Sequence, residues 1–153
     1  MPLPCRKRGK TKHLASAGYN LMRTPPHILF ADNEPDILEL VQVVLETAGF
    51  RVSTSDSAAG VLELTATERF DVVLLDYWMA DTTGVEPCRQ IRAFDQSTPI
   101  LICSGAVSQA DQKAAVLAGA QGYLKKPFSS RDLVLALSSF LTATNNDGFE
   151  SDC

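Results

Sequence analysis

Residues 70–86, FDVVLLDYWMADTTGVE, contain an unbroken apolar run that ends in an aspartate. Val72 to Leu75 carry no polar side chain, which is typical of a strand that is buried on both faces of a parallel sheet. Asp76 follows this run directly, and residues 84–93 have the length of a short helix. The stretch therefore predicts a buried strand over residues 70–75, a carboxylate at its carboxyl end, and a helix after it.

The same order of a short apolar run and a longer amphipathic segment occurs five times between His27 and Leu141. The predicted strands cover residues 28–31, 50–54, 70–75, 99–103 and 122–124, and the predicted helices follow each of them. The fold class is therefore α/β: a doubly wound (βα)5 domain with a five-stranded parallel sheet and helices on both faces.

Polar and glycine residues mark the expected helix ends. The first helix covers residues 35–48 with Pro35 in its first turn and Gly49 after its end, and the fourth covers residues 108–117 and ends at Gly119. Either Ser55 or Asp56 can cap the second helix, which runs to about Thr67, and either Ser129 or Ser130 can cap the fifth.

Charge divides the 153-residue chain into a basic leader and an acidic body. Residues 1–26 hold six basic and no acidic side chains, whereas residues 27–153 hold 8 basic and 18 acidic ones, a formal −10. We expect a disordered leader over residues 1–26, a folded domain over 27–141 and a short polar, acidic tail over 142–153. Met22 is an alternative start. An acidic body argues against nucleic-acid binding by the folded domain, because phosphates need a basic surface.

The sequence favours a reduced, cytoplasmic setting. Its four cysteines, Cys5, Cys88, Cys103 and Cys153, show no CxxC pair and no spacing typical of a disulfide framework or zinc site. No apolar run approaches the roughly 20 residues of a membrane span, and the basic N-terminus lacks the apolar stretch of a signal peptide. We expect no membrane association.

Chemistry-bearing side chains fall at the carboxyl ends of the predicted strands. In an open parallel sheet this edge holds the ligand. The residues there are Asp32, Asn33, Glu34, Asp76, Ser104 and Lys126. Carboxylates at this edge suit Mg²⁺, and Asp76 can attack phosphorus to form an aspartyl phosphate. Ser104 and Lys126 can then bind the phosphoryl oxygens.

The chain resembles the response-regulator receiver family from His27 to about Leu141. Four stretches carry the resemblance: residues 28–40 (ILFADNEPDILEL), 70–86, 98–105 (TPILICSG) and 118–128 (AGAQGYLKKPF). It implies a flavodoxin-like receiver fold of the stand-alone, single-domain type. It further implies a two-component or phosphorelay function that depends on Mg²⁺.

Residue by residue, the resemblance implies Asp76 as the phosphoacceptor and Asp32 as an acidic-pocket residue. Ser104 takes the place of the hydroxyl that contacts the phosphoryl group. Lys126 takes the place of the conserved-type lysine, followed by Pro127, which is often cis in this family.

Two aromatic residues receive roles from the same resemblance. Tyr123 falls at the position of the switch aromatic, which would move inward together with Ser104. The competing interpretation makes Tyr123 a half-buried strand residue whose hydroxyl meets solvent. The backbone carbonyl of Trp78 would be a metal ligand, while its side chain is either plain surface packing or a partner contact.

Asn33 departs from the family pattern, which has two adjacent acids at the end of the first strand. In the better-fitting register Asn33 occupies the position of the direct metal ligand; in the other, Ala31 replaces the first acid and Asp32 is the direct ligand. Either register lacks one carboxylate, so we expect weaker Mg²⁺ binding than is typical. Trp78 and Ala106 stand where receivers tune phosphoryl hydrolysis; neither orients water well, which predicts a long-lived phosphoryl state.

The predicted function is a phosphoacceptor response regulator and not an enzyme beyond its own phosphorylation and dephosphorylation. Its expected partners are a histidine kinase or histidine phosphotransfer protein and a downstream target protein. A chemotaxis-type regulator and a phosphorelay intermediate both fit. The alternative is a pseudo-receiver, a binding module that is not phosphorylated, which Asn33 favours and Asp76, Ser104 and Lys126 oppose. A phosphatase would need an acid where Trp78 stands.

Overall fold

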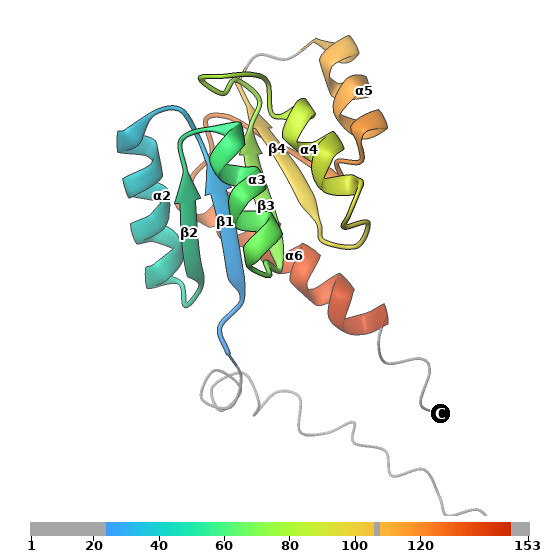
Figure 1. Ribbon diagram of the computed structural model, residues 1–153. Helices are drawn as coiled ribbons and strands as arrows, with labels where there is room; N and C mark the ends of the chain where they lie inside the picture. The colour runs from blue at the N-terminus through green and yellow to red at the C-terminus, as the bar shows by residue number, and fades with distance from the viewer. Residues whose placement is uncertain (1–23, 106–107, 148–153) are drawn as a thin grey trace, which may run out of the picture.

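A computed structural model describes residues 24–105 and 108–147, with side chains as far as Leu141. One five-stranded parallel sheet has helices on both faces (Figure 1), which confirms the predicted fold class. Its strands are β1 (His27–Ala31), β2 (Arg51–Ser55), β3 (Val72–Asp76), β4 (Ile100–Ser104) and β5 (Gly122–Lys125). Its helices are α2 (Pro35–Thr47), α3 (Ala58–Thr67), α4 (Val85–Arg92), α5 (Gln109–Ala118) and α6 (Ser130–Asp147).

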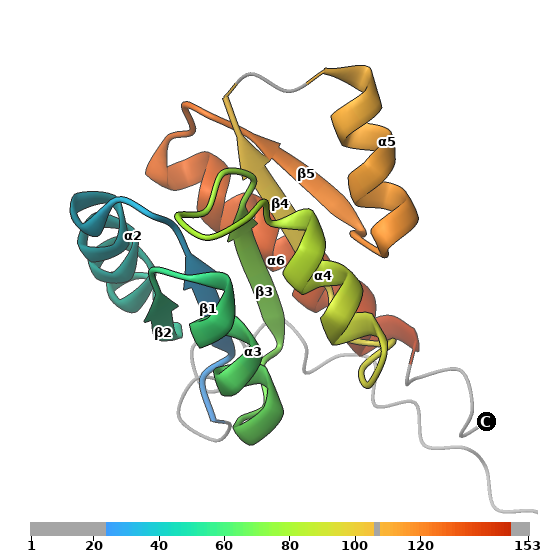
Figure 2. The same cartoon turned by 45° about the horizontal axis from the view of Figure 1, so that its top comes forward.

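The strand order is β2-β1-β3-β4-β5, so the chain reverses its direction of travel across the sheet between β1 and β3. Helices α2 and α6 cover one face, and α3, α4 and α5 cover the other (Figure 2). The crevice at such a reversal, beyond the carboxyl ends of the strands, is where ligands bind in sheets of this kind. Here that crevice lies between β1 and β3.

Alternate residues of the central strands fill two separate hydrophobic clusters. On β3, Val73 and Leu75 pack under α3, α4 and α5, whereas Val72 and Leu74 pack under α2 and α6. Every residue of β1, β3 and β4 is buried. The unbroken apolar run of β3 is therefore required because neither of its faces meets water.

Most predicted helix ends are confirmed. Gly49 and Gly119 have the positive φ angles, 100° and 107°, that favour glycine after a helix. Ser129 accepts from the amide of Asp132 at the start of α6. The capping prediction for α3 is wrong: Ser57, not Ser55 or Asp56, accepts from the amide of Gly60. Ser55 instead ends β2 and donates its hydroxyl to the Ser57 carbonyl.

Several predicted boundaries shift by one or two residues. β2, β3 and β4 each begin later and run one residue further than expected, so Asp76 and Ser104 are the last residues of paired strands. Helix α6 continues beyond Leu141 to Asp147. Residues 1–23 of the expected leader and 148–153 of the expected tail lie outside the described residues.

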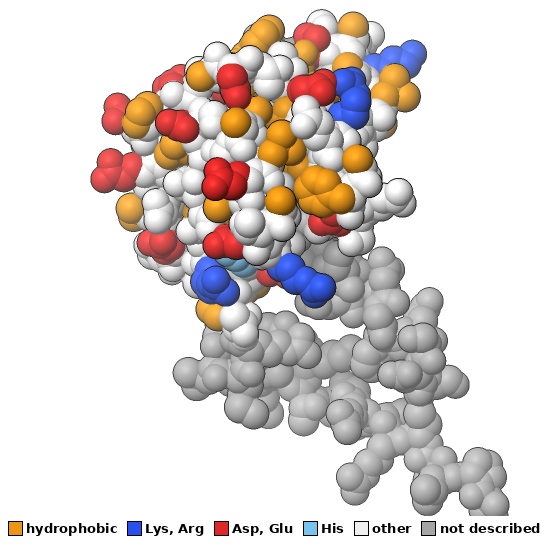
Figure 3. Space-filling view, in the orientation of Figure 1, with side chains coloured by type: hydrophobic (Ala, Val, Ile, Leu, Met, Phe, Trp, Pro, Cys, Tyr) orange, Lys and Arg blue, Asp and Glu red, His pale blue; other side chains and the backbone are white. Residues whose placement is uncertain are grey.

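Acidic side chains are spread over the face of the molecule shown in Figure 3, with a few Lys and Arg side chains near its edges. This distribution agrees with the excess of acidic residues in the chain after residue 26. Within the described part of the chain, no helix has the length and apolar character needed to cross a membrane.

Candidate functional site

The carboxyl ends of β1, β3 and β5 bring two carboxylates and one ammonium group together. Lys126 Nζ lies 2.7 Å from Asp32 Oδ2 and 3.1 Å from Asp76 Oδ1. Parallel pairing positions these groups: Ala31 aligns with Leu75, and Asp76 aligns with Cys103 on β4. Side chains that are 94 and 50 residues apart in sequence thus form one bridged triad.

Burial sets the electrostatics of this triad. Burial raises the pKa of Asp76, while the Lys126 ammonium acts in the opposite direction and Asp32 raises it further. Burial alone would lower the pKa of Lys126, but its hydrogen bonds to Asp32 and Asp76 outweigh that effect and raise it. The ammonium is therefore held charged beside two carboxylates, and with both ionised the triad carries one net negative charge.

Asp32 is fixed in place by two further contacts. Its Oδ1 accepts from the Glu34 amide at 3.0 Å, and its own amide donates to the Ser55 carbonyl at the end of β2. The Asp32 side chain is fully buried, whereas Asn33 is exposed at the rim. Asp32 is therefore an inner residue of this edge and Asn33 an outer one.

Ser104 and Tyr123 place two buried hydroxyl groups beside the triad. Neither hydroxyl oxygen has a hydrogen-bond partner among the described residues, and Ser104 is only 2% exposed. Burial raises the pKa of Tyr123, and the nearby Ser104 hydroxyl opposes that shift, so the two groups are neighbours without a well-formed hydrogen bond. The interpretation in which the Tyr123 hydroxyl meets solvent is wrong for this structure.

The loop over residues 77–84 follows β3 and is closed by two backbone hydrogen bonds. Met79 N donates to Thr82 O at 2.9 Å, and Gly84 N donates to Tyr77 O at 2.8 Å. Both bonds bypass the Trp78 carbonyl. The Trp78 side chain is 59% exposed and meets the Tyr77 ring edge to face, with centroids 4.9 Å apart.

Gly84 allows the helix after this loop to approach the end of β3 closely. A Cβ atom on Gly84 would clash with the Asp76 carbonyl oxygen. The backbone of Gly84, with φ −65°, is ordinary, so glycine is required here by space and not by conformation. Helix α4 can therefore begin directly against the last residue of β3.

Two contacts at the site had no signal in the sequence. The Tyr77 hydroxyl donates to Asp111 Oδ1 at 2.7 Å, which joins β3 to the start of α5. The Asp81 carboxylate accepts from the amides of Ala58 and Ala59 at the start of α3. Both pairs span more than twenty residues, so only the packing of the helices brings them together.

The residues at this edge offer oxygen ligands of the kind that Mg²⁺ prefers. They are the carboxylates of Asp32 and Asp76, the Asn33 amide and the Trp78 carbonyl. Among the described residues, no group of three or more His, Cys, Asp or Glu side chains is arranged to hold a metal. The donor set thus fits a hard cation by chemistry but has one carboxylate fewer than a three-acid site. The Lys126–Pro127 peptide bond beside it is cis, as expected from the resemblance.

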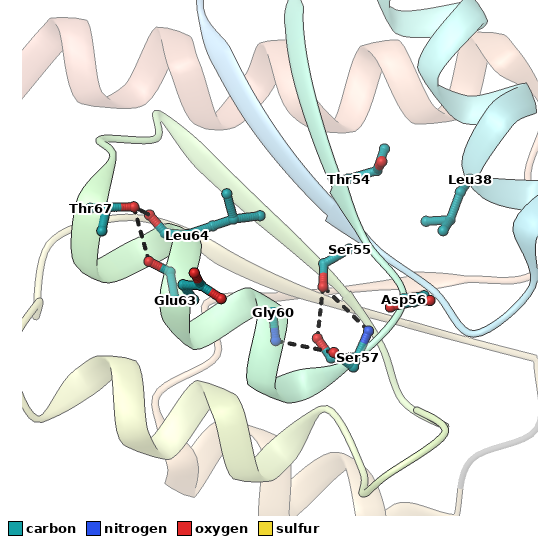
Figure 4. Close-up of a pocket in the computed structure, with 9 residues that line it drawn as sticks. All are labelled: Leu38, Thr54, Ser55, Asp56, Ser57, Gly60, Glu63, Leu64 and Thr67. Carbon is teal, nitrogen blue, oxygen red and sulfur yellow. Dashed lines mark hydrogen bonds between the residues drawn. The ribbon is translucent and has the colours of Figure 1, made fainter.

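A separate hollow of about 500 Å³ follows the edge strand β2 (Figure 4). It is lined by Leu38, Thr54, Ser55, Asp56, Ser57, Gly60, Glu63, Leu64 and Thr67. Three of its hydroxyl side chains, those of Ser55, Ser57 and Thr67, already form hydrogen bonds within the lining, as the dashed lines show. None of the triad residues lines it.

A doubly wound sheet with a buried aspartate pair and a bridging lysine at its carboxyl edge defines a receiver domain. The chain belongs to the response regulator receiver domain family, whose model matches residues 28–138. It is therefore a signalling domain of the two-component type. Among curated proteins it is similar to the response regulator SaeR of Staphylococcus aureus, with 30% identity over 116 residues. That match covers 76% of this chain and 50% of SaeR, so the chain spans about half the length of this relative.

Solved structures give the same family. The chemotaxis protein CheY4 of Vibrio cholerae is 29% identical with a TM-score of 0.74, covering 77% of this chain and all of that chain. The receiver domain of the sensor histidine kinase PA1611 from Pseudomonas aeruginosa has a TM-score of 0.72 at 24% identity, covering 78% of this chain and 99% of that chain. That second structure has a magnesium ion coordinated in its active site cleft. At this identity the likeness shows the fold alone.

Proposed function

We propose that this receiver is a phosphoacceptor response regulator, in which Asp76 takes a phosphoryl group in a Mg²⁺-dependent reaction. The donor is a histidine kinase or a histidine phosphotransfer protein. One observation supports this most: Lys126 bridges Asp32 and Asp76 at the buried carboxyl edge of the sheet. The same three residue types stand where the family resemblance requires them.

The residues divide the chemistry between them. An Asp76 oxygen attacks phosphorus, the bond from phosphorus to the donor nitrogen breaks, and an acyl phosphate forms on Asp76. Lys126 moves its hydrogen bond from the carboxylate to a phosphoryl oxygen and neutralises part of the added charge. Asp32, Asn33, Asp76 and the Trp78 carbonyl would hold the cation, which supplies charge neutralisation when bound.

Ser104 and Tyr123 are the proposed switch. The Ser104 hydroxyl is buried without a partner, and an unsatisfied buried hydroxyl is costly. A phosphoryl oxygen on Asp76 would give it one, because β4 places Ser104 one residue past the Asp76–Cys103 pair. Tyr123 fills the adjacent space, so a shift of Ser104 changes its packing and alters the surface around β5.

The signal leaves through a contact with a downstream target protein. A chemotaxis-type regulator that docks on its target and a phosphorelay intermediate both remain consistent with the site. The presence of Asp76, Ser104 and Lys126 together argues against a binding module that is not phosphorylated. Trp78 offers no water-orienting group beside Asp76, which supports a long-lived phosphoryl state; Ala106 lies outside the described residues. A half-life of seconds in vitro would contradict this.

Mass spectrometry of the intact chain tests the proposal. Incubation with acetyl phosphate and Mg²⁺ should add the mass of one phosphoryl group, and chelation of the cation should prevent it. The Asp76→Asn variant should gain no mass, whereas Asp56→Asn, which changes an exposed aspartate outside the triad, should behave like the wild type. A wild-type chain that never gains the mass, with small donors or a cognate kinase, would overturn the phosphoacceptor function.

A further inference from the structure

The tip of the loop over residues 77–84 is tied to a neighbouring helix by Asp81. The Asp81 carboxylate accepts from Ala58 N at 3.0 Å through one oxygen and from Ala59 N at 3.4 Å through the other. Ala58 and Ala59 are the first two residues of α3. The loop that leaves the phosphoacceptor is therefore held by a contact with a segment 22 and 23 residues earlier in the chain.

This contact uses groups that a helix leaves free. The first amides of a helix have no partner within the helix, and a carboxylate there also meets the positive end of the helix dipole. The bond to the Ala58 amide is the main reason why the pKa of Asp81 is lowered, so the carboxylate stays charged at neutral pH. Ser57 satisfies a third amide, that of Gly60, from within α3 itself.

The loop is held at its base by the Tyr77–Gly84 bond and nearer its tip by the Met79–Thr82 bond and the buried Met79 side chain. Ala80 and Asp81, at the tip between Met79 and Thr82, are exposed. Trp78 lies between these two bonds, and its carbonyl takes part in neither. That carbonyl lies in the same peptide plane as the Met79 amide, which donates to Thr82, so its direction follows the turn over residues 79–82 that Asp81 ties to α3.

We propose that Asp81 is a positioning residue: by tying the loop to the start of α3, it holds the Trp78 carbonyl at the edge of the site where the cation binds. The role deepens the proposed function, on which it rests. Asp81 itself touches neither the cation nor the phosphoryl group. Its effect passes through the backbone of residues 78–81.

Ser57 provides a matched control, because it caps the same helix end without touching the loop. Asp81→Ala and Ser57→Ala each remove a capping interaction from α3, and each should lower the stability by a similar amount. Only Asp81→Ala frees the loop. Asp81→Asn keeps one oxygen acceptor and should restore part of the effect.

The first measurement is hydrogen exchange in the absence of metal. The amides of Met79 and Gly84 should exchange faster in Asp81→Ala than in the wild type. Their exchange rates should be unchanged in Ser57→Ala. The second is a Mg²⁺ titration followed by the fluorescence of Trp78, the single tryptophan. The dissociation constant should rise by about three- to tenfold in Asp81→Ala, because cation binding must then order a loop that the capping contact no longer holds. It should rise less in Asp81→Asn and stay within about twofold in Ser57→Ala.

Equal changes in the two alanine variants, in either measurement, would reduce Asp81 to an ordinary helix cap and overturn the positioning role. Faster loop exchange in Asp81→Ala with an unchanged dissociation constant would also overturn it, since the contact of Asp81 with α3 would then have no effect on cation binding. A wild-type chain that binds no Mg²⁺ at all would overturn the proposed function. The exchange data would still show whether Asp81 restrains the loop.

Discussion

At the scale of single residues, Lys126 sets the net charge of the site. Its ammonium contacts two carboxylates and balances the charge of one of them, and its raised pKa keeps it charged over the physiological range. Because a third acid is absent at position 33, the site without cation carries one negative charge instead of two. The attraction for a divalent cation is correspondingly smaller.

Asn33→Asp should strengthen Mg²⁺ binding, because it restores a carboxylate at the exposed rim beside Asp32. We expect the dissociation constant to fall by about tenfold at low ionic strength, equivalent to the interaction of one added charge near the surface. Titration with Trp78 fluorescence measures it. Asp36→Asn, which changes one charge in the first turn of α2, controls for long-range effects. An unchanged affinity in Asn33→Asp would show that position 33 does not face the cation.

Gly84→Ala should disturb Asp76, the proposed phosphoacceptor, directly, because the new methyl group would clash with the Asp76 carbonyl oxygen. We expect a loss of about 1–3 kcal/mol in the free energy of unfolding, as for other overpacking substitutions, and slower phosphorylation by acetyl phosphate. Gly105→Ala is the matched control, since its Cβ would lie at an ordinary 3.8 Å from Lys126 Cβ. Equal effects of the two substitutions in denaturant unfolding would contradict this explanation.

At the scale of elements, the hydrogen bond from Tyr77 to Asp111 connects the residue that follows β3 to α5. Asp111 also completes the capping box of that helix with Ser108. One carboxylate thus serves both the helix end and the residue next to Asp76. Through it, β3 and α5 are linked by a route separate from Ser104 and Tyr123.

Tyr77→Phe should raise the pKa of Asp111, because the Tyr77 hydroxyl is the largest cause of its lowered value. A carboxylate with a lowered folded-state pKa adds stability above its unfolded pKa, near 4, and loses it as the pH falls through the folded value. The variant should therefore lose less stability below about pH 4 than the wild type. NMR titration of Asp111 measures the shift. Tyr123→Phe should leave Asp111 unchanged, and a wild-type-like titration in Tyr77→Phe would rule out the contact in solution.

At the scale of the whole molecule, one sheet separates two hydrophobic clusters, so damage to a central strand affects both. Leu74→Ala, at a fully buried position of β3, should cost about 2–5 kcal/mol and leave a single cooperative transition. Denaturant unfolding followed by circular dichroism measures it. Leu117→Ala is the control, because that side chain is 81% exposed and should change stability by less than about 0.5 kcal/mol. Two separate transitions would show that the clusters unfold independently.

The alternation of apolar runs and helices determined the fold class, since strands buried on both faces need continuous apolar residues and each crossover needs a helix. It also predicted that Asp76, Ser104 and Lys126 follow the third, fourth and fifth strands, and parallel strands share one carboxyl edge. The capping of α3 was predicted incorrectly because Ser55, Asp56 and Ser57 are all capping residues, and local sequence does not choose among them.

The sequence by itself thus determined the strands, the reactive side chains that follow them and the edge of the sheet where these side chains meet. Only the tertiary structure decided how Lys126 bridges two aspartates, that the Tyr123 hydroxyl lies inside, and that Asp81 and Asp111 reach across to other elements. The physical reason is the sequence separation over which each interaction acts. Periodicity and capping act over a few neighbouring residues, whereas these contacts join residues 22 to 94 positions apart and form only when the helices pack onto the sheet.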